Sequence, residues 1–129
     1  LLLRMYDMFR KGLRDIKEDY LSVLKIAEHE ALFLYKALVD GKINGQVYEG
    51  DCACLVGTIA NARKIKYANM IDLRPNGDRP AEKWFLGIKR GDTPENNPIS
   101  AVVRDWTEEF LKERGIAIPT RRVVWEDAV

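Results

Sequence analysis

Hydrophobic residues recur every three or four positions along the first third of the chain, which is the repeat of an α-helix. Charged residues fill most positions between them, so we predict a long amphipathic helix over residues 1–39, ended by Gly41. The repeating apolar positions are Leu2, Tyr6, Phe9, Leu13, Ile16, Tyr20, Leu24, Ala27, Ala31, Leu34 and Leu38. Such a helix would extend about 55 Å at ~1.5 Å per residue, longer than a compact domain of this size is wide. We therefore expect either a break near Gly12 or first turns that protrude.

Residues 52–63 are apolar or small at nearly every position, which predicts a buried central helix surrounded by the other helices. Asp51 comes directly before this segment. It is the expected N-cap, because an aspartate side chain accepts hydrogen bonds from the unpaired N–H groups of a first helical turn. The small side chain of Ala60 and the absence of one at Gly57 would let neighbouring helices approach closely.

Two further helices are predicted after this segment. Residues 80–90 are expected to form a helix capped by Asp78, with a strand over residues 83–89 as the alternative. Asn97 followed by proline indicates the start of another helix, which Gly115 ends.

The remaining segments carry weaker patterns. Residues 42–50 contain an Asn-Gly pair and predict a structured loop, with a minimal β-hairpin as the alternative. A short helix is expected around residues 67–72 and an extended tail over residues 116–129. The chain thus predicts a mainly α fold with about five helices packed around residues 52–63 and at most a minimal β element.

The composition of the 129 residues, 47% apolar and 32% charged with a net charge of +1, is typical of a single globular domain. Within it we expect a helical module over residues 40–115 attached to the long N-terminal helix. No apolar run reaches the ~18 residues that span a bilayer, so no membrane contact is expected. The two cysteines, Cys52 and Cys54, point apart on a helix and predict no mutual disulfide, which favours a cytoplasmic setting.

The residues with catalytic or metal-binding chemistry do not form a recognisable set. Cys52, Cys54 and the single histidine, His29, supply three soft ligands, whereas a zinc site usually takes four with paired spacing. A thiol nucleophile would also need a base within hydrogen-bond reach. We expect buried structural thiols and a surface histidine, with no metal, no cofactor and no enzymatic activity; a thiol or metal enzyme is the least favoured alternative.

Basic and aromatic residues gather in two places, which is the pattern of a nucleic-acid surface. The positions are Arg63, Lys64, Lys66, Tyr67, Arg121, Arg122 and Trp125. Because twenty acidic residues nearly balance the basic ones, a solvated surface explains these positions better than a binding site does. Nucleic-acid binding stays as the alternative function.

The excess length of the N-terminal helix favours a different site. Leu2, Met5, Tyr6 and Phe9 would form an apolar helix face outside the compact module, where a partner helix or a second copy could cover it. The principal hypothesis is therefore a non-enzymatic interaction or assembly module that docks on a protein partner, or on itself, through this helix.

Several motifs resemble small uncharacterised domains of bacterial and phage genomes. They are CACLVGTIA at residues 52–60, RPAE at 79–82, Trp84-Phe85 and GDTPEN at 91–96. The resemblance covers about residues 31 to 114 and leaves out most of the N-terminal helix. It implies a bacterial or phage-encoded protein in which a shared module is joined to a variable partner, and it implies no activity.

Overall fold

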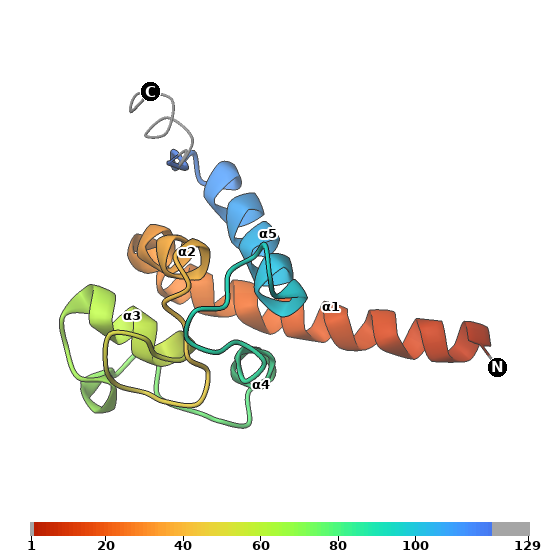
Figure 1. The fold of residues 1–129 in the computed structure, drawn as a ribbon, viewed down its shortest axis with the longest axis horizontal. Coiled ribbons are helices and arrows are strands. Elements are labelled where there is room, and N and C mark those ends of the chain that lie inside the picture. Colours follow the sequence, from red (N-terminus) through yellow and green to blue (C-terminus); the bar gives the residue numbers. More distant parts are fainter. Residues whose placement is uncertain (1, 120–129) are drawn as a thin grey trace.

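The computed structural model describes residues 2–119, which form an all-α fold without β-strands (Figure 1). The elements of this part of the chain are α1 (Leu2–Ile26), η1 (Glu28–Glu30), α2 (Ala31–Val39), α3 (Leu55–Arg63), η2 (Tyr67–Asn69), α4 (Pro80–Phe85) and α5 (Pro98–Glu113), where η marks a 3-10 turn. α2 packs against α3 and α5, and α1 packs against α4 and α5. The predicted fold class is confirmed for the described residues.

The break in the N-terminal helical region lies at residues 27–30, so the expectations of a break near Gly12 and of one helix to residue 39 are wrong. α1 continues past Gly12 and ends at Ile26. Ala27 then leaves the helical conformation, with φ −107° and ψ 40°. An exposed glycine costs a helix only about 1 kcal/mol, which a long amphipathic helix tolerates. The turn at Ala27 instead lets α2 reach α3 and α5, a requirement of tertiary packing.

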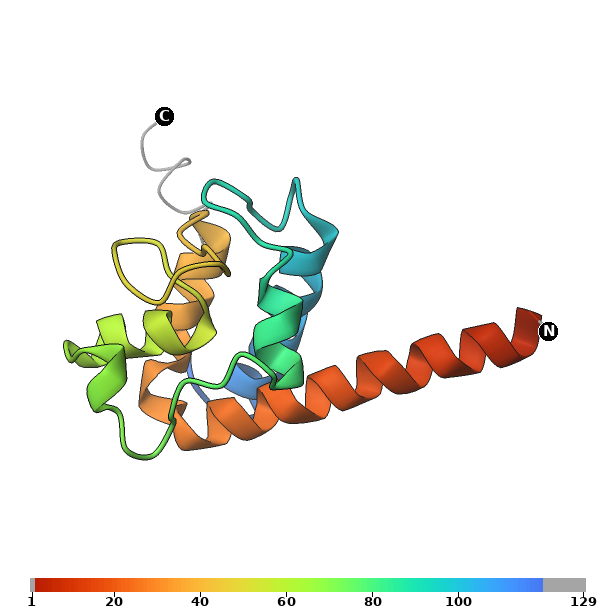
Figure 2. The same cartoon turned by 90° about the horizontal axis from the view of Figure 1, so that it is seen from below.

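The first turns of α1 protrude from the molecule, which was the second expectation from the length of this helix. Every residue from Leu2 to Gly12 is exposed, Leu13 and Ile16 are half-buried, and Tyr20 is fully buried. Two perpendicular views show the N-terminal half of α1 extending beyond all other elements (Figures 1 and 2). The compact part of the fold therefore begins in the second half of α1.

Tyr20 holds α1 against α4 and α5. Its ring lies 5.9 Å from the ring of Phe85 in α4 and 6.2 Å from that of Trp106 in α5, measured between centroids. Its hydroxyl shares a 2.6 Å hydrogen bond with the hydroxyl of Thr107. Burial raises the pKa of Tyr20, so the phenol stays neutral at all ordinary pH values.

The central helix is shorter than predicted and begins at a different cap. α3 starts at Leu55 and is buried over Leu55–Ala60, as expected, but its N-cap residue is Cys54 and Asp51 is exposed. The cysteine sulfur accepts a hydrogen bond from the N–H of Gly57 at 3.4 Å. The predicted Asp51 cap is wrong because Glu82 of α4 supplies the missing carboxylate, accepting from the N–H of Leu55 at 3.0 Å.

The segment before α3 forms a structured loop, as predicted, and no hairpin. Ile43 forms an isolated parallel bridge with Ala53. The loop passes so close to α3 that a Cβ on Gly57 would lie 2.2 Å from the carbonyl oxygen of Tyr48. The expectation that Gly57 permits close approach is confirmed, although the neighbour is this loop and not another helix.

α4 is also capped by a carboxylate from another helix. Arg79 occupies the N-cap position without a side-chain cap bond, and Asp19 of α1 accepts from the N–H of Ala81 at 2.9 Å. The predicted Asp78 cap is therefore wrong. α4 stops at Phe85, short of the predicted residue 90, and residues 83–89 form no strand.

The C-terminal helix follows its local signals. Asn97 accepts hydrogen bonds from the N–H groups of Ile99 and Ser100, at 2.8 and 3.2 Å, and α5 then runs to Glu113. Gly115 ends it with φ +70°. Around residues 67–72 the predicted short helix is reduced to the 3-10 turn η2. Most of the predicted extended tail lies outside the described residues.

Candidate functional site

The first half of α1 carries large apolar side chains that lie in solvent; we call residues 2–15 the α1 tip. Their exposed fractions range from 58% to 81%. The six residues are Leu2, Leu3, Met5, Tyr6, Met8 and Phe9. Four of them, Leu2, Met5, Tyr6 and Phe9, were predicted as a contact face. Leu3 and Met8 were missed, although their positions beside that face on a helical projection show that they widen it.

The exposed face of the α1 tip continues into the face that α1 buries in the fold. Successive apolar residues of this face are separated by four and three positions in turn: Leu2, Tyr6, Phe9, Leu13, Ile16, Tyr20, Val23 and Ala27. The last three are at most 1% exposed. One helix face therefore passes from solvent, through a half-buried zone, into the core.

The charges of the α1 tip are unpaired among residues 2–119. Four cationic and two anionic side chains lie on it, a net charge of +2: Arg4, Arg10, Lys11, Arg14, Asp7 and Asp15. The guanidinium carbon of Arg10 lies 5.6 Å from the centroid of the Tyr6 ring. In contrast, two charged residues in the following turn of α1 form ion pairs with other elements of the fold. Lys17 pairs with Glu109, and Asp19 pairs with Arg79.

The two thiols have different surroundings. Cys54 is buried, and burial together with the neighbouring carboxylate of Glu82 raises the pKa of its thiol to about 12. It is therefore protonated and a poor nucleophile at neutral pH. Cys52 is only half-buried, so the prediction of two buried thiols holds for Cys54 alone. His29 is exposed in η1, as predicted.

In the described part of the chain, the side chains that could bind a metal ion do not cluster. Within residues 2–119 no group of three or more histidine, cysteine, aspartate or glutamate side chains is close enough to hold an ion.

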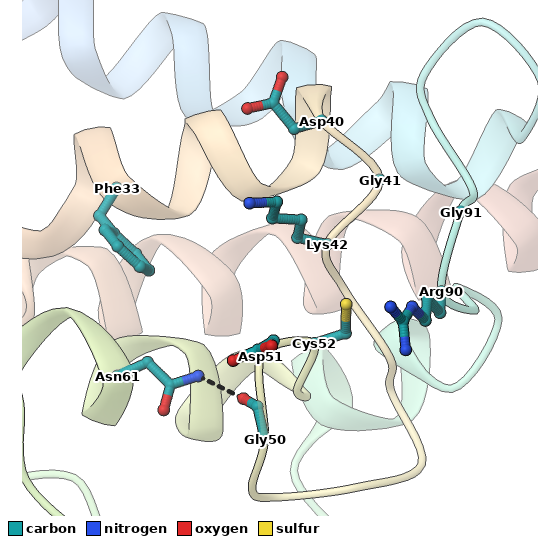
Figure 3. Close-up of a pocket in the computed structure, with 10 residues that line it drawn as sticks. All are labelled: Phe33, Asp40, Gly41, Lys42, Gly50, Asp51, Cys52, Asn61, Arg90 and Gly91. Atoms are coloured by element: carbon teal, nitrogen blue, oxygen red, sulfur yellow. Dashed lines mark hydrogen bonds between the residues drawn. The ribbon is translucent and has the colours of Figure 1, made fainter.

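Cys52 lines an open hollow of about 780 Å³ beside the loop that precedes α3 (Figure 3). The other residues that line this hollow are Phe33, Asp40, Gly41, Lys42, Gly50, Asp51, Asn61, Arg90 and Gly91. The amide of Asn61 donates to the carbonyl of Gly50 at 2.8 Å and fixes one wall. Lys42, Asp51 and Arg90 form no ion pair among the described residues. The hollow thus presents solvated charges of both signs, and no histidine lies beside its thiol.

The basic and aromatic positions of the possible nucleic-acid surface are only partly available. Arg63 donates to Glu30 at 2.6 Å and to both carboxylate oxygens of Asp72, at 2.7 and 3.1 Å. These contacts occupy the donors that would hold a phosphate. Tyr67 stacks on Tyr48, with 4.8 Å between ring centroids.

The exposed Lys64 and Lys66 are the only members of the predicted set left without a partner in the part of the chain that the structure describes. Arg121, Arg122 and Trp125 lie outside the described residues. The alternative function thus rests on two lysines within this part.

Comparison of the chain with protein-family models, with curated proteins and with solved structures gives no match. The resemblance to bacterial and phage domains therefore stays a prediction. Among the described residues, no helix is long and apolar enough to cross a membrane. Among the described residues, the α1 tip gathers six large apolar side chains in solvent.

Proposed function

We propose that the chain is an interaction module that docks on another protein surface through the apolar face of the α1 tip. The observation that carries this proposal is the continuity of one helix face. The same row of positions that packs against α4 and α5 at Tyr20 continues outward as Leu2, Tyr6 and Phe9, without cover among residues 2–119.

The apolar surface and the helical state of the α1 tip both favour a covered tip. Exposed apolar patches of this kind are uncommon on proteins that act alone and mark contact sites. In addition, most helix stability in proteins comes from packing of the apolar face, and the α1 tip has no such packing within residues 2–119. A helical α1 tip with six exposed large side chains is therefore best stabilised by a surface that buries them.

Site-specific photo-crosslinking tests the proposal in the cells from which the chain comes. A benzophenone side chain replaces Phe9 on the apolar face, and the matched control replaces Lys11, which lies on the opposite face of the same helix. We expect a covalent adduct of higher mass from position 9 and little or none from position 11. An adduct from neither position, or equal adducts from both, contradicts the proposal.

The same experiment addresses the composition of the complex. An adduct of twice the chain mass indicates self-association, and any other mass indicates a different protein. Nucleic-acid binding is not proposed separately, because in the described residues only Lys64 and Lys66 remain to support it.

A further inference from the structure

The identity of the surface that covers the α1 tip can be narrowed from its charges; this inference rests on the proposed function. α1 already packs against one amphipathic helix within the fold. Tyr20 contacts Trp106 and Thr107 of α5, and beside this contact Lys17 pairs with Glu109 of α5 at 3.0 Å. The apolar face of α1 is thus bordered by a lysine that meets an acidic residue of its partner helix.

Arg10 repeats this arrangement on the α1 tip. It lies seven residues before Lys17, which is about two helical turns, so both side chains border the same edge of the apolar face. Arg14 lies between them in the sequence, near the same edge. Asp7 lies seven residues before Arg14 on that side of the helix, so this side of the tip carries two arginines and one aspartate. Neither arginine has an ion-pair partner among residues 2–119, whereas Lys17 has Glu109. The exposed stretch therefore has an apolar face bordered by net positive charge, as the packed stretch does, and no acidic helix of residues 2–119 lies against it.

A second copy of the chain fits this surface poorly. In an antiparallel pair the edges that carry Arg10 and Arg14 would face each other. Each edge has two arginines against the one aspartate, Asp7, so its net charge is positive and the two edges repel. In a parallel pair the two folds would collide, because α4 and α5 already cover this face from about Ile16 onward. Charge and geometry both favour a different molecule.

We infer that the α1 tip binds an amphipathic helix of a partner protein, with glutamate or aspartate residues along the edge that meets Arg10 and Arg14. The apolar residues supply the contact area, and the carboxylates select the partner and its orientation, as charges at protein interfaces generally do.

Two designed peptides test this inference with the full chain. Both are amphipathic helices with the same leucine face, and they differ only in the residues beside it, which are glutamate in one and lysine in the other. Fluorescence anisotropy measures their affinities. We expect the glutamate peptide to bind about tenfold or more tightly, and the preference to shrink at about 0.5 M salt as the ion pairs are screened.

Substitutions in the chain give matched controls. The double variant Arg10→Glu/Arg14→Glu should reverse the preference between the peptides. Lys11→Glu changes a charge on the opposite face of the helix and should leave the preference nearly intact. Phe9→Asp should weaken both peptides, because both use the apolar face.

Three outcomes overturn the inference. The first is equal affinity for the two peptides, and the second is a dimer of the chain alone in sedimentation equilibrium that Phe9→Asp dissociates. The third is binding to phosphatidylglycerol vesicles that the glutamate peptide does not displace. In each case a crosslink from position 9 to a protein would still support the proposed function. Failure of this inference can therefore be distinguished from failure of the proposed function.

Discussion

Asp19 and Glu82 each place a carboxylate at the N-terminus of a helix other than their own. Asp19 belongs to α1 and accepts from the first turn of α4, and Glu82 belongs to α4 and accepts from the first residue of α3. The first N–H groups of a helix have no partner inside it, and an anion there also interacts favourably with the helix dipole. The two residues link α1, α4 and α3 in series.

The buried Glu82 makes stability depend on pH. Burial raises the pKa of Glu82 above its usual range, and the hydrogen bonds from Cys54 and Leu55 offset only part of this. Between about pH 4.3 and the raised pKa of Glu82, the folded state therefore binds more protons than the unfolded state, so stability falls as pH rises through this window. Glu82→Gln keeps an acceptor oxygen and removes the charge. We expect urea unfolding from about pH 4 to about pH 8 to show a smaller decline for this variant.

Glu82→Ala is the control for the cap itself. It leaves the N–H of Leu55 without its acceptor, and it should lower the unfolding free energy by about 1–3 kcal/mol near pH 4, where Glu82 is protonated in the wild type. This loss should shrink at higher pH, because the wild type is then destabilised by its own buried charge. If the wild type and Glu82→Gln decline equally with pH, another group is responsible and the account of Glu82 is wrong.

The helices differ in how much of their structure their own residues determine. α5 begins with its own asparagine and ends with its own glycine, as its pattern predicts. α1 tolerates a glycine because Gly12 lies where no other element packs, while α3 requires one at Gly57 because a loop lies against it. The same residue type thus has opposite roles in two elements.

Alanine substitution of the two glycines separates these roles. Gly12→Ala should raise helicity and slow amide hydrogen exchange in the α1 tip, with about 0.5–1 kcal/mol of local stabilisation, because alanine favours a helix. Gly57→Ala should lower the unfolding free energy by about 1–3 kcal/mol or more, since its Cβ would overlap the carbonyl of Tyr48. Circular dichroism and urea unfolding measure both effects. Equal, small effects at the two sites would contradict this account.

Residues 2–119 form a compact helical body and a helix that projects from it. Tyr20 is the junction, since it is the first fully buried residue of α1 and contacts both α4 and α5. A firm attachment at this point determines the direction in which the α1 tip leaves the body, and hence the position of the proposed docking surface relative to it.

Substitution of Tyr20 tests this attachment. Tyr20→Phe removes the hydrogen bond to Thr107 and should cost about 0.5–1.5 kcal/mol of unfolding free energy, whereas Tyr20→Ala should cost about 3–5 kcal/mol by leaving a cavity. Chemical denaturation measures both values. A Tyr20→Ala cost below that of Tyr20→Phe would show that α1 is held elsewhere. Phe9→Asp, in the exposed part of the same helix, serves as the control and should change monomer stability little.

The amino-acid sequence alone determined the features that depend on neighbours along the chain. These are the helical repeat of the first segment, the apolar run that becomes α3, and the asparagine and glycine that bound α5. Hydrophobic periodicity and caps act over a few residues, so they can be read from the chain order. Four of the six exposed apolar residues of the α1 tip were found in the same way.

The tertiary structure decided the features that depend on contacts through space. Carboxylates from distant helices replaced the expected Asp51 and Asp78 caps, and the turn at Ala27 followed from the need of α2 to reach α3 and α5. The apolar face of α1 has one unbroken pattern, and only the fold shows that half of it is buried and half lies in solvent. The periodicity of a sequence indicates which side of a helix is apolar. Which surface covers that side depends on the rest of the molecule or on a partner.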